Sequence, residues 1–354
     1  MPLLARTVTT PLIIDVRRGA VTELGDILAD RRISAGGDVA VVVGPGQGEQ
    51  IADLLRPTLR GADIFTVGGG TLDAANELAA KLRVRSYDAV VGIGGGKTVD
   101  TAKYAATMYG IPMVSVATSL ANDGMASPVA TLDHNGIRGS YGVHVPIAVL
   151  VDLDFVENGP DRQTRAGVAE MVSNISALAD WELAHRVRGE AIDGLAVTLA
   201  RTPAEAVINH PGDMSDDGFV TVLAEGLITS GLAMAVCGSS RPCSGGCHEI
   251  NHAIDILFPG TALHAEQCGV GALFCTFLRG SDRLGQLAAC LGRHGLPRLP
   301  SELGLADEQF VEAVEHAPRT RPDRYTILEH LALDRDEIRA RLKDYVGAIG
   351  DLGD

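Results

Sequence analysis

The chain has few aromatic residues, no excess of positive charge and no long uninterrupted hydrophobic run. Aromatic side chains make up only 4% of its 354 residues, and there is a single tryptophan. The formal net charge is −15, which argues against a nucleic-acid groove or an anionic membrane surface as the binding partner. No window approaches about 18 consecutive apolar residues, the length that spans a bilayer. The most apolar segment, 226–238, is predicted to be a buried helix.

Targeting signals and a disulfide framework are also missing. The N-terminal stretch lacks the basic region, the apolar core and the small-residue cleavage site of a signal peptide. The six cysteines all lie in the last third of the chain, whereas a disulfide framework normally staples a small secreted domain. We therefore expect reduced thiols, a cytoplasmic location, and no nucleic-acid or membrane partner.

Two kinds of segment alternate up to about residue 153. Runs rich in Val, Ile and Ala predict strands, and their continuous apolar character is typical of parallel strands buried on both faces. Amphipathic segments between them predict helices, so the pattern predicts an α/β fold with a doubly wound, Rossmann-like sheet. The predicted strands are 38–44, 62–68, 87–94, 111–117 and 146–152, and the predicted helices are 46–60, 71–83 and 96–110.

A hairpin and a long helical region complete the organisation. The sequence "DHNG" at 133–136 lies between two strand-like segments and predicts a tight hairpin turn. From about residue 160 the strand pattern ends, and 162–189 has the pattern of one long helix that further helices follow. We therefore predict an N-terminal α/β domain over 1–157 and a C-terminal all-α domain over 158–354.

Three consecutive glycines, Gly94, Gly95 and Gly96, lie between a predicted strand and a predicted helix. Glycines let the backbone approach a ligand, and a helix N-terminus offers N–H groups to a pyrophosphate. The P-loop motif fails because Val91 stands where it needs a glycine, and the dinucleotide motif fails at Lys97. The spacing therefore predicts a phosphate-binding loop of no particular family, with a simple tight turn as the alternative.

Histidines gather in the stretch "CSGGCHEINHAIDILFPGTALHAEQC", Cys243–Cys268. His248 and His252 are four residues apart and share one face of a predicted helix, and His264 falls in the first turn of the next. Imidazole ligands favour Zn, Fe, Ni or Cu over Mg. Three such histidines around one helix–loop–helix corner predict a divalent metal site.

Glu170, in an apolar part of the long predicted helix, is the candidate carboxylate ligand. A buried carboxylate needs a partner, and a metal is one; the alternative is that Glu170 faces solvent or pairs with Arg165. A rival to this site is a closed structural zinc site made of Cys243, Cys247, His248 and His252. Its cysteine spacing is unlike that of zinc fingers, so buried thiols are the simpler interpretation.

Four motifs resemble the iron-containing (group III) alcohol dehydrogenase superfamily, and most closely its glycerol-1-phosphate dehydrogenase branch. The resemblance covers roughly residues 90 to 270. It implies the dehydroquinate synthase-like fold of that superfamily, with an NAD(P)-binding domain over 1–157 and a metal- and substrate-binding domain over 158–354. The motifs are "GIGGGKTVDTAK", "SVATSLANDGMASPVATL", "SRPCSGGCHEINHAID" and "LHAEQCGVGAL".

The resemblance implies roles for residues of the first domain. The glycines Gly94, Gly95 and Gly96 would bind the pyrophosphate of NAD(H) or NADP(H). Asp100 and Lys103 would line the cofactor side, and Thr118 and Ser119 would contact the nucleotide. Asp123 would be catalytic beside the nicotinamide, with Ser127 next to it.

The resemblance also implies the metal ligands. In related sugar-phosphate cyclases the first histidine of the matching helix binds metal and the second aids proton transfer. We therefore expect Glu170, His248 and His264 to hold one divalent Zn, Fe or Ni, with His252 as a proton relay or substrate contact. Three departures bear on the substrate: Glu170 replaces an Asp of the branch, Cys247 a Glu, and Ala265 a Gly.

The implied function is the metal-dependent, NAD(P)-linked reduction of a ketose phosphate. Dihydroxyacetone phosphate, reduced to sn-glycerol 1-phosphate, is the expected example, with Arg241 as a candidate contact for the phosphate. The resemblance also implies a homo-oligomer. Two alternatives stay open: a sugar-phosphate cyclase-like lyase that uses NAD transiently, and a catalytically silent NAD-binding protein.

Overall fold

The computed structural model describes residues 8–59 and 61–352 and contains two compact units. Unit 1 is Met1–Asp161 and unit 2 is Arg162–Asp354, a boundary close to the predicted one. Residues 1–7, part of the stretch examined for a signal peptide, lie outside the described residues, as does Arg60, the last residue of one predicted helix.

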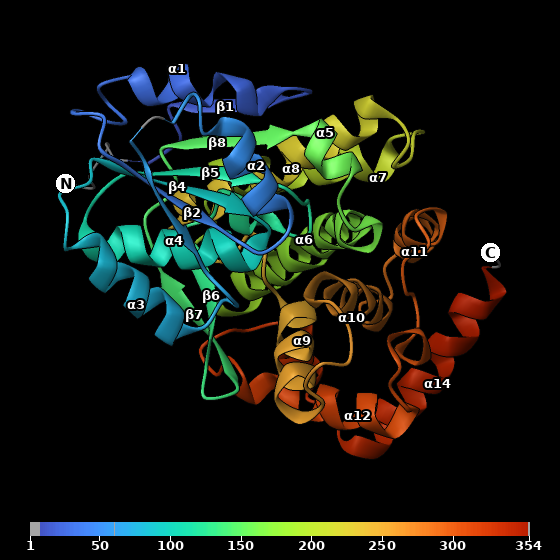
Figure 1. The fold of residues 1–354 in the computed structure, drawn as a ribbon. Coiled ribbons are helices and arrows are strands. Elements are labelled where there is room, and N and C mark those ends of the chain that lie inside the picture. The colour runs from blue at the N-terminus through green and yellow to red at the C-terminus, as the bar shows by residue number, and fades with distance from the viewer. Residues whose placement is uncertain (1–7, 60, 353–354) are drawn as a thin grey trace. The chain divides into compact units, whose positions relative to one another are not determined.

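Unit 1 is built on a sheet of six strands, all paired in parallel, in the order β1-β8-β5-β4-β2-β3 (Figure 1). All five predicted strands are present, each shorter than predicted at one or both ends. The sequence did not predict β1, an edge strand that pairs only with β8 and whose residues are partly exposed. The strands are β1 Ile13–Arg17, β2 Val39–Val43, β3 Asp63–Thr66, β4 Ala89–Gly94, β5 Met113–Ala117 and β8 Ala148–Asp152.

Helices cover both faces of this sheet (Figure 1). On one face Val41 and Val91 share a core with η1, α1 and α2, and on the other Ala40 and Val90 share a core with α3 and α4. Successive residues of a strand thus contribute to opposite cores, which confirms the doubly wound α/β prediction. The bounds are η1 Ala20–Glu23, α1 Leu24–Ala29, α2 Gln47–Leu55, α3 Leu72–Leu82 and α4 Gly96–Tyr109.

The predicted hairpin is present after β5. Strands β6 (Val129–His134) and β7 (Ile137–Gly142) pair antiparallel. Asn135 and Gly136 have φ angles of 54° and 80°, the left-handed conformation that type I′ hairpin turns require at both central positions. The short helices η2 (Asp123–Met125) and α5 (Leu153–Glu157) complete unit 1.

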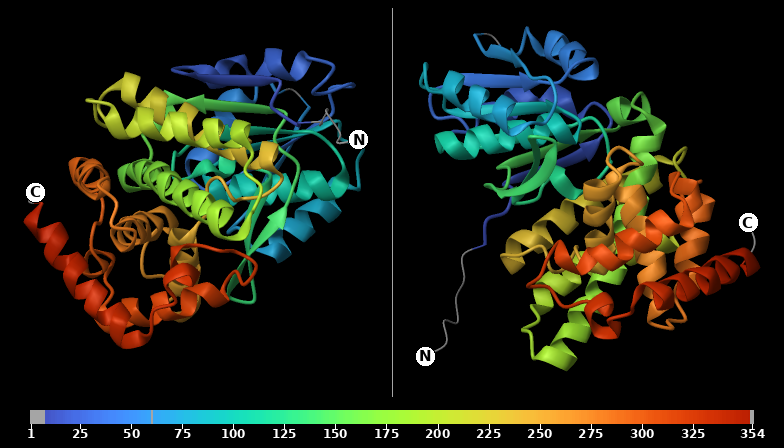
Figure 2. Two further views of the ribbon diagram at one scale, coloured as in Figure 1. Left: turned by 180° about the vertical axis from the view of Figure 1, so that it is seen from behind. Right: turned by 90° about the horizontal axis from the view of Figure 1, so that it is seen from below.

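Among the described residues of unit 2, every regular element is a helix, which confirms the predicted all-α region. Figure 2 shows this segment, coloured green to red, from two further sides. Its long first helix, α6, spans Asp161–Arg188, close to the predicted 162–189. The others are α7 Gly194–Asn209, α8 Asp217–Cys237, α9 Gly246–Leu257, α10 His264–Leu278, α11 Leu284–Arg293, η3 Pro300–Leu303, α12 Asp307–His316, η4 Ala317–Arg319, α13 Ile327–Leu331 and α14 Arg335–Asp351.

Helix α8 contains the most apolar segment of the sequence. Within the described chain it alone is long and apolar enough to cross a membrane, with 21 residues and a mean hydropathy of 1.8 over its most apolar window. In the structure 61% of that window is buried, and α8 packs along α7. A helix that is apolar on all sides and mostly covered has the character of a core helix.

Candidate active site

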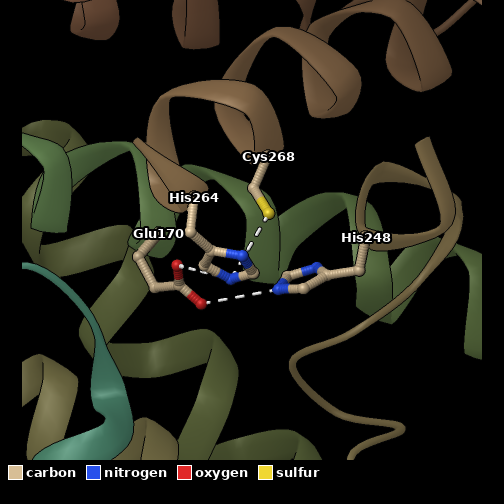
Figure 3. A group of neighbouring side chains, drawn as sticks. All are labelled: Glu170, His248, His264 and Cys268. Carbon is tan, nitrogen blue, oxygen red and sulfur yellow. Dashed lines mark hydrogen bonds and ion pairs between the residues drawn. The ribbon is translucent and has the colours of Figure 1, made fainter. Parts of the chain in front are cut away.

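Four side chains with metal-binding atoms converge in unit 2 (Figure 3). Glu170 comes from α6, His248 from α9, and His264 and Cys268 from successive turns of α10. One ligand atom of each lies within 4.8 Å of the others. His248 Nε2 is 3.5 Å from Glu170 Oε1, His264 Nε2 is 3.8 Å from Glu170 Oε2, and Cys268 Sγ is 3.6 Å from His264 Nε2.

The surroundings of Glu170 fit a cation. Its side chain is 3% exposed, so the alternative that it faces solvent is wrong. Within the described chain its Oε2 atom is buried and accepts no hydrogen bond. Burial raises the pKa of Glu170, and the charge of His264 opposes that rise. A carboxylate oxygen in this position needs a proton or a positive ion, and a divalent metal would supply the charge.

The histidine nearest to Glu170 has the protonation state that metal binding requires. Burial, with smaller contributions from Arg321 and Arg324, lowers the pKa of His248 to about 3. The imidazole is therefore neutral at physiological pH, and neutral imidazole is the form that coordinates a metal. Two imidazoles, a carboxylate and a nearby thiol suit Zn, Fe or Ni rather than Mg or Ca.

The rival zinc site of two cysteines and two histidines is not assembled among the described residues, where the only such donor group is the one above. Cys243 instead exchanges hydrogen bonds with Ser230. Burial raises the pKa of Cys247 to about 12, so this thiol stays protonated. All six cysteines lie in the described part of the chain and are free thiols there.

His252 lies one turn of α9 beyond His248. Its Nε2 atom is 3.0 Å from Nη2 of Arg321 and accepts a hydrogen bond from that guanidinium. Burial first, and then the charge of Arg321, lowers the pKa of His252 to about 2. His252 is thus neutral, and because Nε2 accepts, we assign its ring proton to Nδ1.

The glycine loop of unit 1 follows β4, at the point where the strand order reverses. The chain passes from β2 to β3 on one side and resumes at β4 on the other side of β2. In open α/β sheets ligands bind beyond the carboxyl ends of the strands at such a switch point. Gly94 has a φ of 154°, and a Cβ there would lie 2.9 Å from the Thr98 side chain, so local structure already demands glycine.

A small cavity adjoins this loop. Ser119 lines it together with two of the three predicted glycines, and Thr118 is buried close by, its amide donating to the Gly94 carbonyl at 3.1 Å. Asp123 begins η2 and is buried. The lining residues are Gly94, Gly96, Val99, Ala117, Ser119, Ala121, Asn122 and Met125.

Asp100 and Lys103 support the segment that follows η2. The buried ammonium of Lys103 donates to the carbonyls of Gly124 at 2.6 Å and Val129 at 2.5 Å, and lies 2.9 Å from Asp100 Oδ1. Asp100 Oδ2 accepts from the Thr131 amide at 3.0 Å. Their polar atoms therefore hold the backbone around Asp123 and Ser127, and a direct contact with cofactor stays a prediction.

With this geometry in view, similarity to known proteins identifies the family. The profile described as iron-containing alcohol dehydrogenase matches residues 15–160. A glycerol-1-phosphate dehydrogenase [NAD(P)+] of Methanospirillum hungatei is 37% identical over 319 residues, covering 88% of this chain and 86% of the relative. One from Hyperthermus butylicus is 36% identical over 345 residues, covering 96% and 98%. The chain belongs to the iron-containing alcohol dehydrogenase family.

A solved structure agrees with this family in fold. A probable glycerol dehydrogenase from Sinorhizobium meliloti superimposes with a TM-score of 0.80 at 20% identity. The superposition covers 98% of this chain and 100% of the glycerol dehydrogenase chain. The predicted group III dehydrogenase fold is thereby confirmed. The protein is accordingly an oxidoreductase, which disfavours the alternative of a catalytically silent protein.

Two arginines of this dehydrogenase that sequence analysis missed lie beside the histidines of α9. Arg321 Nη1 and Arg324 Nη2 donate to the same hydroxyl, Ser240 Oγ, at 3.0 and 3.1 Å. Arg241, the predicted phosphate contact, instead forms a bidentate ion pair with Glu190. Its Nε donates to Oε1 and its Nη2 to Oε2, each at 2.8 Å. The signal in the sequence was the basic run "PRTRPDR" (318–324) in an otherwise acidic chain.

A buried acid of α6, Asp180, holds the start of the helix that carries His248. Its Oδ2 accepts from the Gly246 amide, the first residue of α9, at 2.8 Å. Its Oδ1 accepts from the Ile327 amide at 2.8 Å and forms an ion pair with Arg279. Asp180 therefore positions α9 relative to α6, and no local pattern in the sequence distinguishes it.

Proposed function

We propose that this dehydrogenase reduces a ketose phosphate, such as dihydroxyacetone phosphate, to sn-glycerol 1-phosphate or a related polyol phosphate. NADH or NADPH supplies the hydride, and one divalent metal takes part. The observation that carries the proposal is the convergence of Glu170, His248 and His264, with a buried carboxylate oxygen that lacks a hydrogen bond among the described residues. The names of the two relatives, glycerol-1-phosphate dehydrogenase [NAD(P)+], support glycerol 1-phosphate as the product and NAD(P) as the cofactor.

Glu170, His248 and His264 hold the metal in this proposal. Catalytic zinc sites commonly use three protein ligands and leave one position for water or substrate. The chemistry that Zn²⁺, Fe²⁺ or Ni²⁺ would supply there is polarisation of the substrate carbonyl and stabilisation of negative charge on its oxygen. Cys268 Sγ, 3.6 Å from His264 Nε2, borders this set without being needed as a ligand.

The remaining predicted residues bind the cofactor and move protons. The domain 1–157 binds NAD(P) through Gly94, Gly95 and Gly96, with Thr118, Ser119 and Ser127 contacting it, and the domain 158–354 binds metal and substrate. The cofactor carries the redox chemistry, and the protein supplies orientation and electrostatics. Asp123 and His252 are the candidate catalytic residues; neutral His252 keeps Nδ1–H available to pass a proton.

Two features of the sequence point instead to a cyclase-like lyase, a reaction that the similarity to dehydrogenases disfavours. Glu170, in place of the shorter Asp of the branch, and the four-residue spacing of His248 and His252 both favour it. In that reaction NAD is oxidised and reduced within one turnover, and phosphate leaves. The two candidates therefore differ in whether NADH is consumed overall.

One assay distinguishes them. Purified protein is stripped of metal, reloaded with Zn²⁺, Fe²⁺ or Ni²⁺ in turn, and mixed with NADH or NADPH and a panel of ketoses and ketose phosphates. We expect NAD(P)H absorbance to fall with dihydroxyacetone phosphate, the activity to vanish on chelation, and one metal to restore it. Phosphate release from a sugar phosphate without net loss of NADH would instead support the lyase.

A further inference from the structure

The hydrogen bonds of Arg321 and Arg324 that the structure describes all go to uncharged acceptors. Arg321 donates to Ser240 Oγ and to His252 Nε2, each at 3.0 Å. Arg324 donates to Ser240 Oγ at 3.1 Å and to the carbonyl oxygen of Ser244. All of these acceptors are uncharged, and in the described part of the chain neither guanidinium forms an ion pair with an acid.

Two other arginines of unit 2 with buried guanidiniums do pair with acids. Arg279 pairs with Asp180, and Arg241 pairs with Glu190. The chain has 45 acidic residues against 30 Lys and Arg, so acids to pair with are plentiful. Two partly buried guanidiniums left without an acid in such a chain point to a negative charge that is not part of the protein.

The charge of Glu249 acts on both guanidiniums, but within the described residues Glu249 forms no ion pair with either of them. Its Oε2 atom accepts a hydrogen bond from the hydroxyl of Thr326 at 3.1 Å instead. Burial and the neighbouring Arg321 lower the pKa of Arg324 to about 10, which still leaves it charged. The pair therefore presents two positive charges under physiological conditions.

Arg321 and Arg324 lie near the candidate metal ligands. Arg321 contacts His252, which follows His248 by about one turn of α9, an axial rise of about 5.4 Å. In dihydroxyacetone phosphate the phosphate is only a few bonds from the carbonyl carbon. A carbonyl oxygen beside His248 and a phosphate beside Arg321 are thus within the span of one small molecule.

We propose that Arg321 and Arg324 form the phosphate-binding subsite of this active site, with Ser240 holding both guanidiniums in place. The inference rests on the proposed function and names the feature that selects phosphorylated ketoses. A guanidinium presents two parallel N–H groups to phosphate oxygens, and two guanidiniums match a phosphate dianion in charge. Charged phosphate oxygens are stronger acceptors than the hydroxyl and carbonyl oxygens that these guanidiniums contact in the structure.

The test compares phosphorylated with unphosphorylated substrate. Arg321→Met and Arg324→Met are each assayed with dihydroxyacetone phosphate and dihydroxyacetone, and inorganic phosphate is titrated as a competitive inhibitor. We expect the ratio of kcat/KM between the two substrates to fall roughly 10- to 100-fold per arginine, because hydrogen bonds to charged groups have that strength. The inhibition constant of inorganic phosphate should rise in parallel.

Two controls guard against misfolding. Arg319→Met removes an exposed arginine of the same segment and should leave the ratio unchanged. Arg321→Lys and Arg324→Lys keep a positive charge but lose the forked geometry, so their ratios should lie between wild type and the Met variants. Metal content and a thermal melt show whether each variant is folded. If a Met variant does not fold, the ratio measured with the corresponding Lys variant tests the proposal.

The outcomes separate the two proposals. If the wild type reduces dihydroxyacetone phosphate but no Arg321 or Arg324 variant changes the ratio or the phosphate inhibition, the subsite is overturned and the proposed function stands. If the wild type reduces no ketose phosphate, the proposed function fails. Phosphate binding, measured by calorimetry on wild type and variants, then decides the subsite by itself.

Discussion

The imidazole Nε2 of His248 lies 3.5 Å from the Oε1 carboxylate oxygen of Glu170, across two helices of unit 2. Two donors that each lie about 2.1 Å from a shared zinc are separated by about 3.4 Å in tetrahedral geometry. The observed separation is thus close to that of two ligands of one ion, and it is long for a hydrogen bond.

Removing His248 should therefore release the metal, whereas removing His252 should not. We expect His248→Ala and Glu170→Ala to lose metal after dialysis, because each deletes one of three ligands. His252→Ala should retain metal and turn over more slowly. Metal content by inductively coupled plasma mass spectrometry, normalised to protein, checks both statements. Equal retention in the His248 and His252 variants would refute the ligand assignment.

Cys268→Ser is the matched control for this experiment. Its sulfur belongs to the same donor group, but three protein ligands suffice for a catalytic site. The variant should keep its metal. A cobalt-substituted enzyme should correspondingly lack the intense near-ultraviolet band that a thiolate ligand produces, and observing that band would add Cys268 to the ligand set.

Asp180→Asn should destabilise the protein and weaken its hold on metal. The substitution keeps the shape of the side chain but leaves the guanidinium of Arg279 buried without a carboxylate. Breaking a buried pair in this way costs about 3–5 kcal/mol of unfolding free energy. Metal affinity should fall as well, because Gly246 at the start of α9 loses its charged acceptor.

Urea denaturation and a competitive chelator titration measure the two effects. Glu308→Gln, which breaks the exposed pair of Glu308 with Arg339, is the comparison and should change neither quantity measurably. A stable Asp180→Asn protein with wild-type metal affinity would show that α9 is positioned by its packing alone.

How far the sequence predicts the fold depends on how buried each strand is. The apolar runs of β2, β4, β5 and β8 are covered on both faces and were all predicted. The edge strand β1 carries Asp15 and Arg17 among its apolar residues and has the burial pattern of a half-exposed segment. Such a strand lacks the continuous apolar run on which the prediction depended.

The sequence likewise predicts some residues of the candidate site and not others. Residue types and spacing indicated Glu170 and the three histidines, and the family resemblance selected His248 and His264, which the structure brings together with Glu170. Asp180 acts on a backbone amide 66 residues away, and Arg321 acts on a histidine 69 residues away. No local pattern encodes such partners, because long-range hydrogen bonds depend on how the helices pack rather than on spacing along the chain.

Acid should destabilise the protein partly through His294. This ring is 3% exposed and stacks on Phe219 at 4.7 Å. Burial first, then Arg293, lowers the pKa of His294 from 6.5 to about 4, with Asp213 opposing and Arg165 adding to the shift. Between pH 6.5 and about pH 4, His294 is therefore protonated in the unfolded chain but neutral in the folded protein. The contribution of His294 to the free energy of unfolding is thus fully present above pH 6.5 and is lost as the pH falls towards 4.

The loss attributable to His294 should amount to roughly 1 to 3 kcal/mol. His294→Gln should remove this part, so that the difference in unfolding free energy between pH 7 and pH 4.5 becomes smaller than in wild type. His134→Gln, in the exposed hairpin, is the matched control. Denaturant titrations on metal-free protein provide the measurement; parallel pH dependence in wild type and His294→Gln would contradict the expectation.

Gly96→Ala tests whether the glycine loop serves a ligand or only the turn. A Cβ at Gly96 would meet nothing closer than the Asn122 amide nitrogen at 3.9 Å, whereas at Gly94 it would meet Thr98 at 2.9 Å. Gly96 is helical and lines the cavity, so alanine should leave stability equal or raise it by about 0.5–1 kcal/mol. A methyl group that faces the cofactor should nevertheless weaken NAD(P)H binding roughly tenfold or more, as measured by fluorescence titration.

Gly347→Ala, at an exposed helical glycine, should leave binding unchanged. If Gly96→Ala bound the nucleotide as tightly as Gly347→Ala, the loop would be a structural turn, and the pyrophosphate would have to bind elsewhere.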